Sequence, residues 1–162
     1  MPKDTYFNLP DEKRRRIVDA AKEVFSENHY SHVTIDAIIK RAEIPRGSFY
    51  QYFDDKHDLF RHIFRLIGND KNDALIEEII NVSAESFSDL VVRMIKKSRE
   101  FENKDEIMIR LKDRFLRECP QEVKQDILND VRPMSYKLFE TIIRIFVERG
   151  EFREDFDIKL AA

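Results

Sequence analysis

Apolar residues recur at helical spacing along most of the chain, which has 162 residues. The pattern predicts a first helix over about residues 9–28, capped by Asn8 and with Pro10 in its first turn. The inward stripe of this helix is predicted to consist of Ile17, Ala21, Val24 and Phe25. Glycine is scarce and strand-like alternation is hard to find, so the sequence predicts an all-α fold.

Two short helices are predicted next. Thr34 is expected to cap a helix that ends near residue 41 or 42, because a threonine hydroxyl can accept a bond from a free backbone N–H. Pro45 is expected to open a helix over about residues 45–52, since proline fits a helix start. Residues 42–44 join the two tightly. This arrangement is typical of a helix-turn-helix.

Longer helices follow. Asp54 or Asp55 is expected to cap a long helix with an apolar stripe formed by Leu59, Ile63, Phe64 and Ile67. Further helices are predicted to open at Ser86, Asn103 and Pro120.

The helix that opens at Pro120 is predicted to be kinked or irregular at Pro133 and to end at Gly150. Its apolar stripe runs from Val123 to Ile145 and suits either core packing or a partner helix. Residues 152–162 are expected to open one more helix.

Composition places the chain among folded proteins of the cytoplasm. It is 42% hydrophobic and 38% charged, and charges interrupt every apolar run before it reaches the length of a membrane span. The N-terminus lacks the apolar block of a secretory signal. Cys119 is the only cysteine, which excludes an intrachain disulfide and fits a reducing compartment.

Charge alone does not indicate nucleic-acid binding. The net charge is −3, with 29 basic and 32 acidic residues. The basic run at residues 13–16 is interpreted as a solvated helix face, with a contact to a DNA backbone as the alternative. The evidence for DNA binding must therefore come from how the residues are arranged.

The helix predicted at residues 45–52 has two different faces. Apolar side chains expected to point inward and brace it are Ile44, Phe49 and Phe53. Polar side chains expected to face outward are Arg46, Ser48, Tyr50 and Tyr52. Gly47 would allow close approach of the backbone, and Lys56 would meet a phosphate. A short braced helix of this kind can enter the major groove, which is about 12 Å wide.

Residues 34–59, TIDAIIKRAEIPRGSFYQYFDDKHDL, resemble the signature of TetR-family regulators. Residues 17–25 resemble the preceding helix of that family, so that the resemblance covers about residues 13–65. Its core, Gly-Ser-Phe-Tyr-x-Tyr-Phe-x-x-Lys, is much richer than a general helix-turn-helix pattern. The chain departs from the family at Glu43, where glycine is usual, and at Pro45, where a small residue or serine is usual. Glu43 is therefore expected to adopt a turn conformation less suited to it.

The resemblance implies roles for individual residues. Thr34 would cap its helix and touch the DNA backbone, and Arg46 and Ser48 would address bases or nearby phosphates. Tyr50 and Tyr52 would contact phosphates or thymine methyl groups. The DNA-binding residues expected in this way are Thr34, Arg46, Gly47, Ser48, Tyr50, Tyr52 and Lys56.

The resemblance also implies a division into two parts. Residues 1–54 would form a three-helix DNA-binding head, and residues 55–162 a helical domain that binds a small-molecule effector and a second copy. Family members usually continue through two more helices, so this domain is expected to be incomplete. Residues expected to line a largely apolar effector pocket, if they do not simply fill a core, are Phe87, Met94, Phe101, Met108, Phe115 and Phe139.

Enzymatic and metal-binding chemistry finds no support in the residue pattern. His29 and His32 are expected in a turn, and His57 and His62 are five residues apart, which misaligns them on a helix. A phosphate-cradling glycine loop is also missing from the sequence. We therefore expect no cofactor and no catalysis.

The preferred interpretation is a repressor that binds a near-palindromic site in double-stranded DNA as a homodimer and is released by an effector. The alternatives are a DNA-bound structural or adaptor protein with the same head, and a helical ligand-binding protein or enzyme with a vestigial head. Genome-wide occupancy discriminates the first two, because a regulator occupies a few promoters and an adaptor many dispersed sites.

Overall fold

A computed structural model describes residues 1–80 and 86–153, and in this part of the chain every regular element is a helix. Four helices form a head, with a 3₁₀ turn at Tyr30–His32: α1 (Asp4–Phe7), α2 (Asp11–Glu27), α3 (Ile35–Ala42) and α4 (Arg46–Tyr52). Four more form the body: α5 (Lys56–Ile80), α6 (Phe87–Glu102), α7 (Glu106–Arg117) and α8 (Gln121–Glu148). The predicted all-α fold is confirmed.

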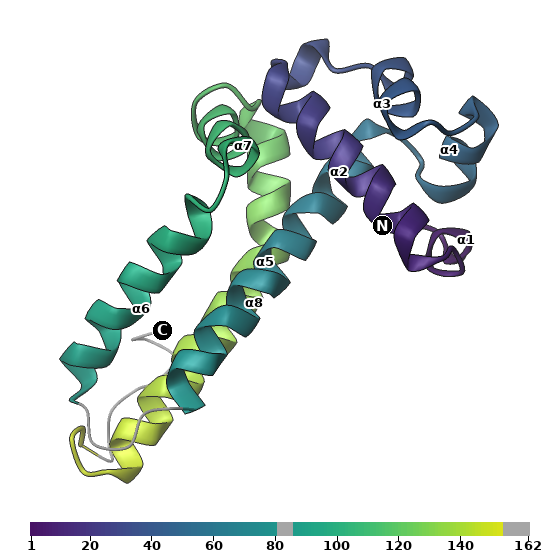
Figure 1. Ribbon diagram of the computed structural model, residues 1–162. Helices are drawn as coiled ribbons and strands as arrows, with labels where there is room; N and C mark the ends of the chain where they lie inside the picture. Colours follow the sequence, from purple (N-terminus) through teal and green to yellow (C-terminus); the bar gives the residue numbers. More distant parts are fainter. Residues whose placement is uncertain (81–85, 154–162) are drawn as a thin grey trace.

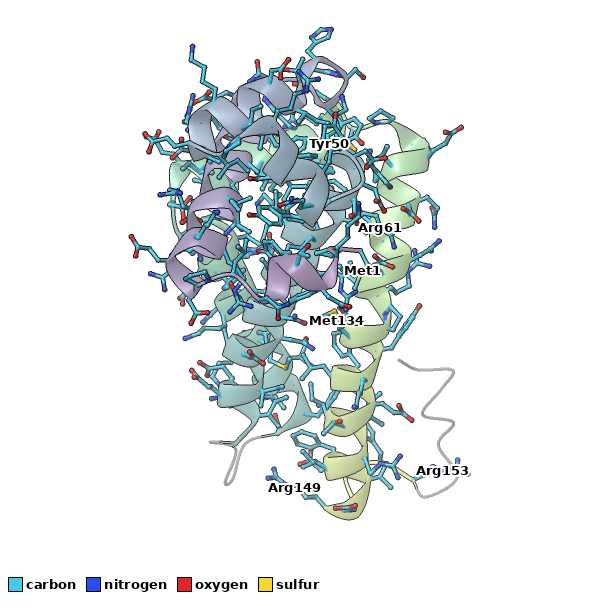
Figure 2. The ribbon with its side chains drawn as sticks, turned by 90° about the vertical axis from the view of Figure 1, so that its right-hand side faces the viewer. Met1, Tyr50, Arg61, Met134, Arg149 and Arg153 are labelled. Atoms are coloured by element: carbon cyan, nitrogen blue, oxygen red, sulfur yellow. The ribbon has the colours of Figure 1, made fainter. Side chains whose placement is uncertain are left out.

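The body is built around its two longest helices. Helices α5 and α8 run side by side along the molecule, and α6 packs against α5 (Figure 1). Helix α7 lies at the end next to the head and packs against α2. Figure 2 shows Tyr50 at the head end of the molecule and Arg149 at the far end of α8. The body is therefore elongated, and the head lies at one end of it.

Several predicted caps and stripes are confirmed. The Ala37 N–H donates to Thr34 Oγ1 over 3.2 Å, and α3 ends at Ala42 as expected. The Asp58 N–H donates to Asp55 Oδ1 over 2.8 Å, and Ser86 caps α6. The stripe predicted for α2, which comprises Ile17, Ala21, Val24 and Phe25, is buried.

Two predicted helix starts were wrong for the same reason. Asn8 ends the short helix α1, which the pattern did not predict, and α2 begins after Pro10. Asn103 ends α6, because its N–H donates to the carbonyls of Arg99 and Glu100, and Asp105 caps α7 instead. Asparagine suits either end of a helix, so the residue type did not decide which end it occupies.

Helix α8 continues across Pro133 without an irregular turn. Pro133 is exposed on the surface of the helix, where water can replace the N–H donor that proline lacks. Gly150 follows the end of the helix with a φ of 76°, the left-handed conformation that glycine adopts at little cost. The further helix expected over residues 152–162 lies mostly outside the described residues.

One apolar core passes from the head into the body. It contains Phe49 and Phe53, which are both fully buried, together with Leu59 and Ile63 of the first turns of α5. Residues of α7 and α8 complete it, namely Leu111, Phe115 and Ile127. A second core at the far end of the body contains Leu75, Leu90, Met94, Leu138, Ile142 and Phe146. The division predicted between residues 54 and 55 stays a prediction.

The turn of the helix-turn-helix holds the only non-glycine residue with a positive φ in the described part of the chain. Glu43 has a φ of 53° and ψ of 47°, and its N–H donates to the Ile39 carbonyl to close α3. A side chain disfavours this left-handed conformation by about 1–2 kcal/mol. The strain expected from the departure at Glu43 is therefore present.

We expect Glu43→Gly to raise the free energy of unfolding by about 1 kcal/mol, since glycine has no Cβ to clash in this conformation. Urea denaturation measures the change. Glu43→Ala is the control, because alanine removes the charge but keeps the Cβ. Equal stability of the two variants would show that the charge, not the backbone, governs the turn.

Candidate DNA-binding surface and ligand cavities

Helix α4 is held in place by its apolar face. Phe49 and the cap residue Phe53 are four residues apart, so they lie on one side of the helix, and both are fully buried. Pro45 precedes the first turn, and the Ile44 N–H donates to the Ile39 carbonyl across the turn. The helix is seven residues long and cannot be stable alone, so this packing makes it rigid.

The opposite face of α4 is open. Tyr50 is 43% exposed, and the side chain of Arg46 is 61% exposed. Arg46 Nη1 lies 2.7 Å from Asp36 Oδ1 on α3. The pKa of the Arg46 guanidinium is raised, first by the neighbouring Tyr50 side chain and then by Asp36. Gly47 is exposed and a Cβ added there would meet no atom within 4 Å, while Ser48 is half-buried. Thr34 is exposed at the start of α3.

Tyr52 does not face outward, contrary to the prediction. It is 5% exposed, because it lies three residues after Phe49 and so shares the inner face of α4. The Tyr6 ring packs edge-on against it at 6.5 Å between centroids, and Lys13 Nζ lies 5.7 Å from its ring centroid. We therefore do not include Tyr52 in the DNA-binding set.

Lys56 is engaged inside the protein rather than free for a phosphate, contrary to the prediction. Its Nζ donates to the carbonyls of Tyr30 and Val33 over 2.9 Å and to that of Ser31 over 3.3 Å. The ammonium has three donors, and these bonds use all of them. Burial lowers its pKa. Lys56 thus anchors the 3₁₀ turn to the start of α5.

The sequence pattern missed a strap at the N-terminus that holds the end of α4. The Lys3 N–H donates to the Tyr52 carbonyl over 2.9 Å, and Lys3 Nζ donates to the Tyr50 carbonyl over 2.9 Å. The Thr5 hydroxyl donates to the Gln51 carbonyl. The last carbonyls of a helix have no partner within it, so the strap satisfies three of them. No local motif marks this contact, because it joins residues more than 45 positions apart.

The basic run of α2 divides into two pairs. Lys13 and Arg14 make intramolecular contacts, Lys13 with the Tyr52 ring and Arg14 with Asp11 and the Phe7 carbonyl. Arg15 and Arg16 are exposed and make no ion pair among the described residues. Arg15 and Arg16 are therefore the residues of this run that are most open to a partner.

Two cavities lie in the body between α5, α6, α7 and α8. The larger has a volume of about 610 Å³, and its lining includes Met94 and Phe139 from the predicted set. The smaller has a volume of about 320 Å³, and its lining includes Phe101, Met108 and Phe115. Phe87 lines neither cavity. It packs against Phe146 and Phe152 at the far end of the body, which agrees with the alternative that it fills a core.

The described helices include none that is long and apolar enough to cross a bilayer. Across residues 1–80 and 86–153, no three potential metal ligands of the histidine, cysteine and carboxylate types come together.

Comparisons with known proteins agree with this geometry. The family described as "Bacterial regulatory proteins, tetR family" matches residues 17–63. The Fatty acid metabolism regulator protein of Bacillus subtilis (strain 168) is 28% identical over 152 residues, which cover 92% of this chain and 75% of that protein.

Solved structures share the fold. A TetR family transcriptional regulator from Chloroflexus aurantiacus has 29% identity and a TM-score of 0.61, with 99% of this chain and 73% of that chain covered. The regulator FadR from Bacillus subtilis, in complex with stearoyl-CoA, has 24% identity and a TM-score of 0.74, with 91% and 77% covered. The chain spans about three quarters of the length of these relatives.

The braced helix with an open polar face defines a DNA-binding transcriptional regulator of the helix-turn-helix class. The chain is similar to the TetR family of bacterial regulators over residues 17–63, and to a named regulator over most of its length. The relatives it matches are named as regulators, not as enzymes.

Removing the strap's side-chain donors is expected to weaken DNA binding. Lys3→Ala combined with Thr5→Ala leaves two carbonyls of α4 without these partners, each bond contributing about 1 kcal/mol to its position. We expect affinity for a duplex selected by the wild-type protein from random sequence to fall about fivefold to tenfold. Fluorescence anisotropy measures this. Lys104→Ala combined with Thr141→Ala, a matched pair in the body, serves as the control, and equal affinities of the two double variants would refute the role of the strap.

His62 of α5, which contacts Tyr6 of the head, makes the fold sensitive to acid. Burial lowers the pKa of His62 from 6.5 to about 4, and the positive charge of Arg65 adds to this effect. The Nε2 atom of His62 lies 3.2 Å from the Tyr6 hydroxyl, which donates to the neutral ring. Burial raises the pKa of Tyr6 to about 12, so this donor keeps its proton. A histidine whose pKa is lower in the folded state contributes full stability above pH 6.5 and loses it as the pH falls towards 4.

Each pKa unit corresponds to about 1.4 kcal/mol, so the free energy of unfolding is expected to fall by on the order of 3 kcal/mol across this window. Urea denaturation at a series of pH values measures the fall. His62→Gln, which cannot gain the proton, is expected to show a correspondingly weaker dependence on pH. Parallel profiles for wild type and variant would assign the acid sensitivity to other groups.

Proposed function

We propose that the chain is a ligand-released repressor that binds a near-palindromic operator as a homodimer. The observation that carries this proposal is α4 itself, a short helix fixed from behind by Phe49 and Phe53 with Arg46 and Tyr50 open on its other face. Two such helices in a symmetric dimer would enter successive major grooves about 34–36 Å apart.

The proposed DNA contacts fall into two groups. Arg46 would exchange the carboxylate of Asp36 for a base edge or a phosphate, and Ser48 and Tyr50 would contact the adjoining groups. Gly47 would let the backbone approach closely. Phosphates beside the groove would be met by Thr34 at the start of α3 and by the exposed residues Arg15, Arg16 and Lys40.

Residues 1–54 would then act as the DNA-binding part, and the body that follows as the effector-binding and dimerisation part. The two cavities have volumes in the range of small-molecule sites and a mainly apolar lining. Regulators similar to this chain include one named for fatty acid metabolism and one solved with stearoyl-CoA, which supports a largely apolar effector here.

Release would follow from the connection of head and body through α5. An effector that binds better to a body conformation with the wrong spacing of the two heads would lower affinity for the operator. The shift is limited to the difference in its affinity for the two conformations.

The proposal is tested by titrating an operator selected by the wild-type protein from random duplexes. Arg46→Ala and Tyr50→Ala are each expected to cost about 1–3 kcal/mol of binding free energy, and Arg46→Ala would reduce the salt slope by about one if it meets a phosphate. Asp36→Asn, which removes the competing carboxylate, is expected to tighten binding.

The control is Lys96→Ala, which removes an exposed positive charge from α6 in the body. If it weakens binding as much as Arg46→Ala, the effect is that of net charge and α4 is not the contact surface. Unchanged affinity in an Arg46→Ala and Tyr50→Ala double variant would refute the proposal outright.

A further inference from the structure

The two cavities meet at a charged cluster. Four residues line both of them, namely Phe64, Ile67, Lys71 and Glu102. The first two are apolar, so Lys71 and Glu102 are the charged groups that both cavities share. The sequence pattern gave no sign of this, because neither residue lies in a recognisable motif.

Glu102 is held between two lysines. Lys71 Nζ donates to Glu102 Oε1 over 2.5 Å, and Lys112 Nζ donates to Glu102 Oε2 over 3.4 Å. The three side chains are 31–37% exposed, so water screens them only in part. Burial raises the pKa of Glu102, but the bonds from Lys71 and Lys112 outweigh it, and the pKa is lowered overall. Glu102 is thus an ionised carboxylate that accepts hydrogen bonds from the ammonium groups of Lys71 and Lys112.

The charges that line each cavity do not cancel. The larger cavity has Lys71 and Arg99 against Glu102, and the smaller has Lys71 and Lys112 against Glu102. Each therefore has one positive charge in excess in an otherwise mainly apolar lining. An anion gains from this balance, whereas a cation would have to displace a lysine and would meet the remaining one.

We propose that Lys71 and Lys112 bind the carboxylate of an aliphatic acid at the junction of the two cavities, with its chain along the apolar wall of the larger one. The carboxylate of Glu102 occupies this position in the structure, and the carboxylate of the ligand replaces it on the two lysines. The chain of the acid contacts Leu75, Met94 and Leu138, which belong to the wall of the larger cavity. The inference depends on the proposed function only where it identifies this ligand as the effector that releases the operator.

The test measures binding without DNA, so that its failure is distinct from failure of the proposed operator binding. Isothermal titration calorimetry on the full chain compares decanoate, decan-1-ol and decylammonium, which share a chain length and differ in the charge of the head group. Decanoate is expected to bind at least tenfold more tightly than either of the others. Decanoyl-CoA is the fourth probe, because it carries the same chain on a thioester.

Variants then locate the head group. Lys71→Met, which keeps the length of the side chain, is expected to weaken decanoate about tenfold and leave decan-1-ol unchanged. Glu102→Gln, which removes the competing carboxylate, is expected to tighten decanoate. Lys96→Met on the outer surface of α6 is the matched control and is expected to change neither affinity.

Three results would overturn the inference. The first is decylammonium or decan-1-ol binding as tightly as decanoate, and the second is decanoate affinity that Lys71→Met does not change. The third is decanoyl-CoA binding more tightly than decanoate with no loss in Lys71→Met, which would place the charged head group outside the junction. Circular dichroism of each variant excludes unfolding as the cause of any loss.

Discussion

The burial of Phe49 and Phe53 beneath α4 is the contact on which the rest of the molecule depends. A helix of seven residues is not stable alone, so its orientation is set by the core it packs on. That core also contains Leu59 and Ile63 of α5 and Phe115 of α7. The surface offered to DNA and the walls of the cavities are therefore opposite sides of one packed structure, and a shift on either side changes packing on the other.

Local features were predictable from the sequence because their causes are local. Thr34 caps α3 through an N–H three residues away, and the stripe of α2 follows from helical periodicity alone. The strained turn at Glu43 was expected because the family usually has glycine at this position, and the φ of 53° agrees with that expectation. The family signature added the function, since the same short helices without it would indicate a helix-turn-helix of any kind.

Contacts between distant residues were not predictable. Nothing in the sequence near Lys56 shows that its ammonium meets the carbonyls of Tyr30 and Val33, and a free lysine at a helix start looks the same. Tyr52 was assigned to the wrong face because tyrosine suits both a core and a polar surface. Lys71 lies on α5 and Glu102 on α6. The sequence does not show how these two helices align with each other, so their ion pair could not be predicted from it.

The ties between head and body suggest how the body can control the head. Within the body, Arg61 on α5, the helix that follows the head, bonds Asp130 of α8 over 2.7 Å, and Figure 2 shows it beside α8. Arg114 on α7 donates to the carbonyl of Ser26 at the end of α2 over 2.8 Å. Helix α7 therefore presents one side to the smaller cavity and another to the head. Because a packed interface shifts between discrete arrangements rather than bending continuously, a ligand that repacks α7 must also move α2 or break this bond.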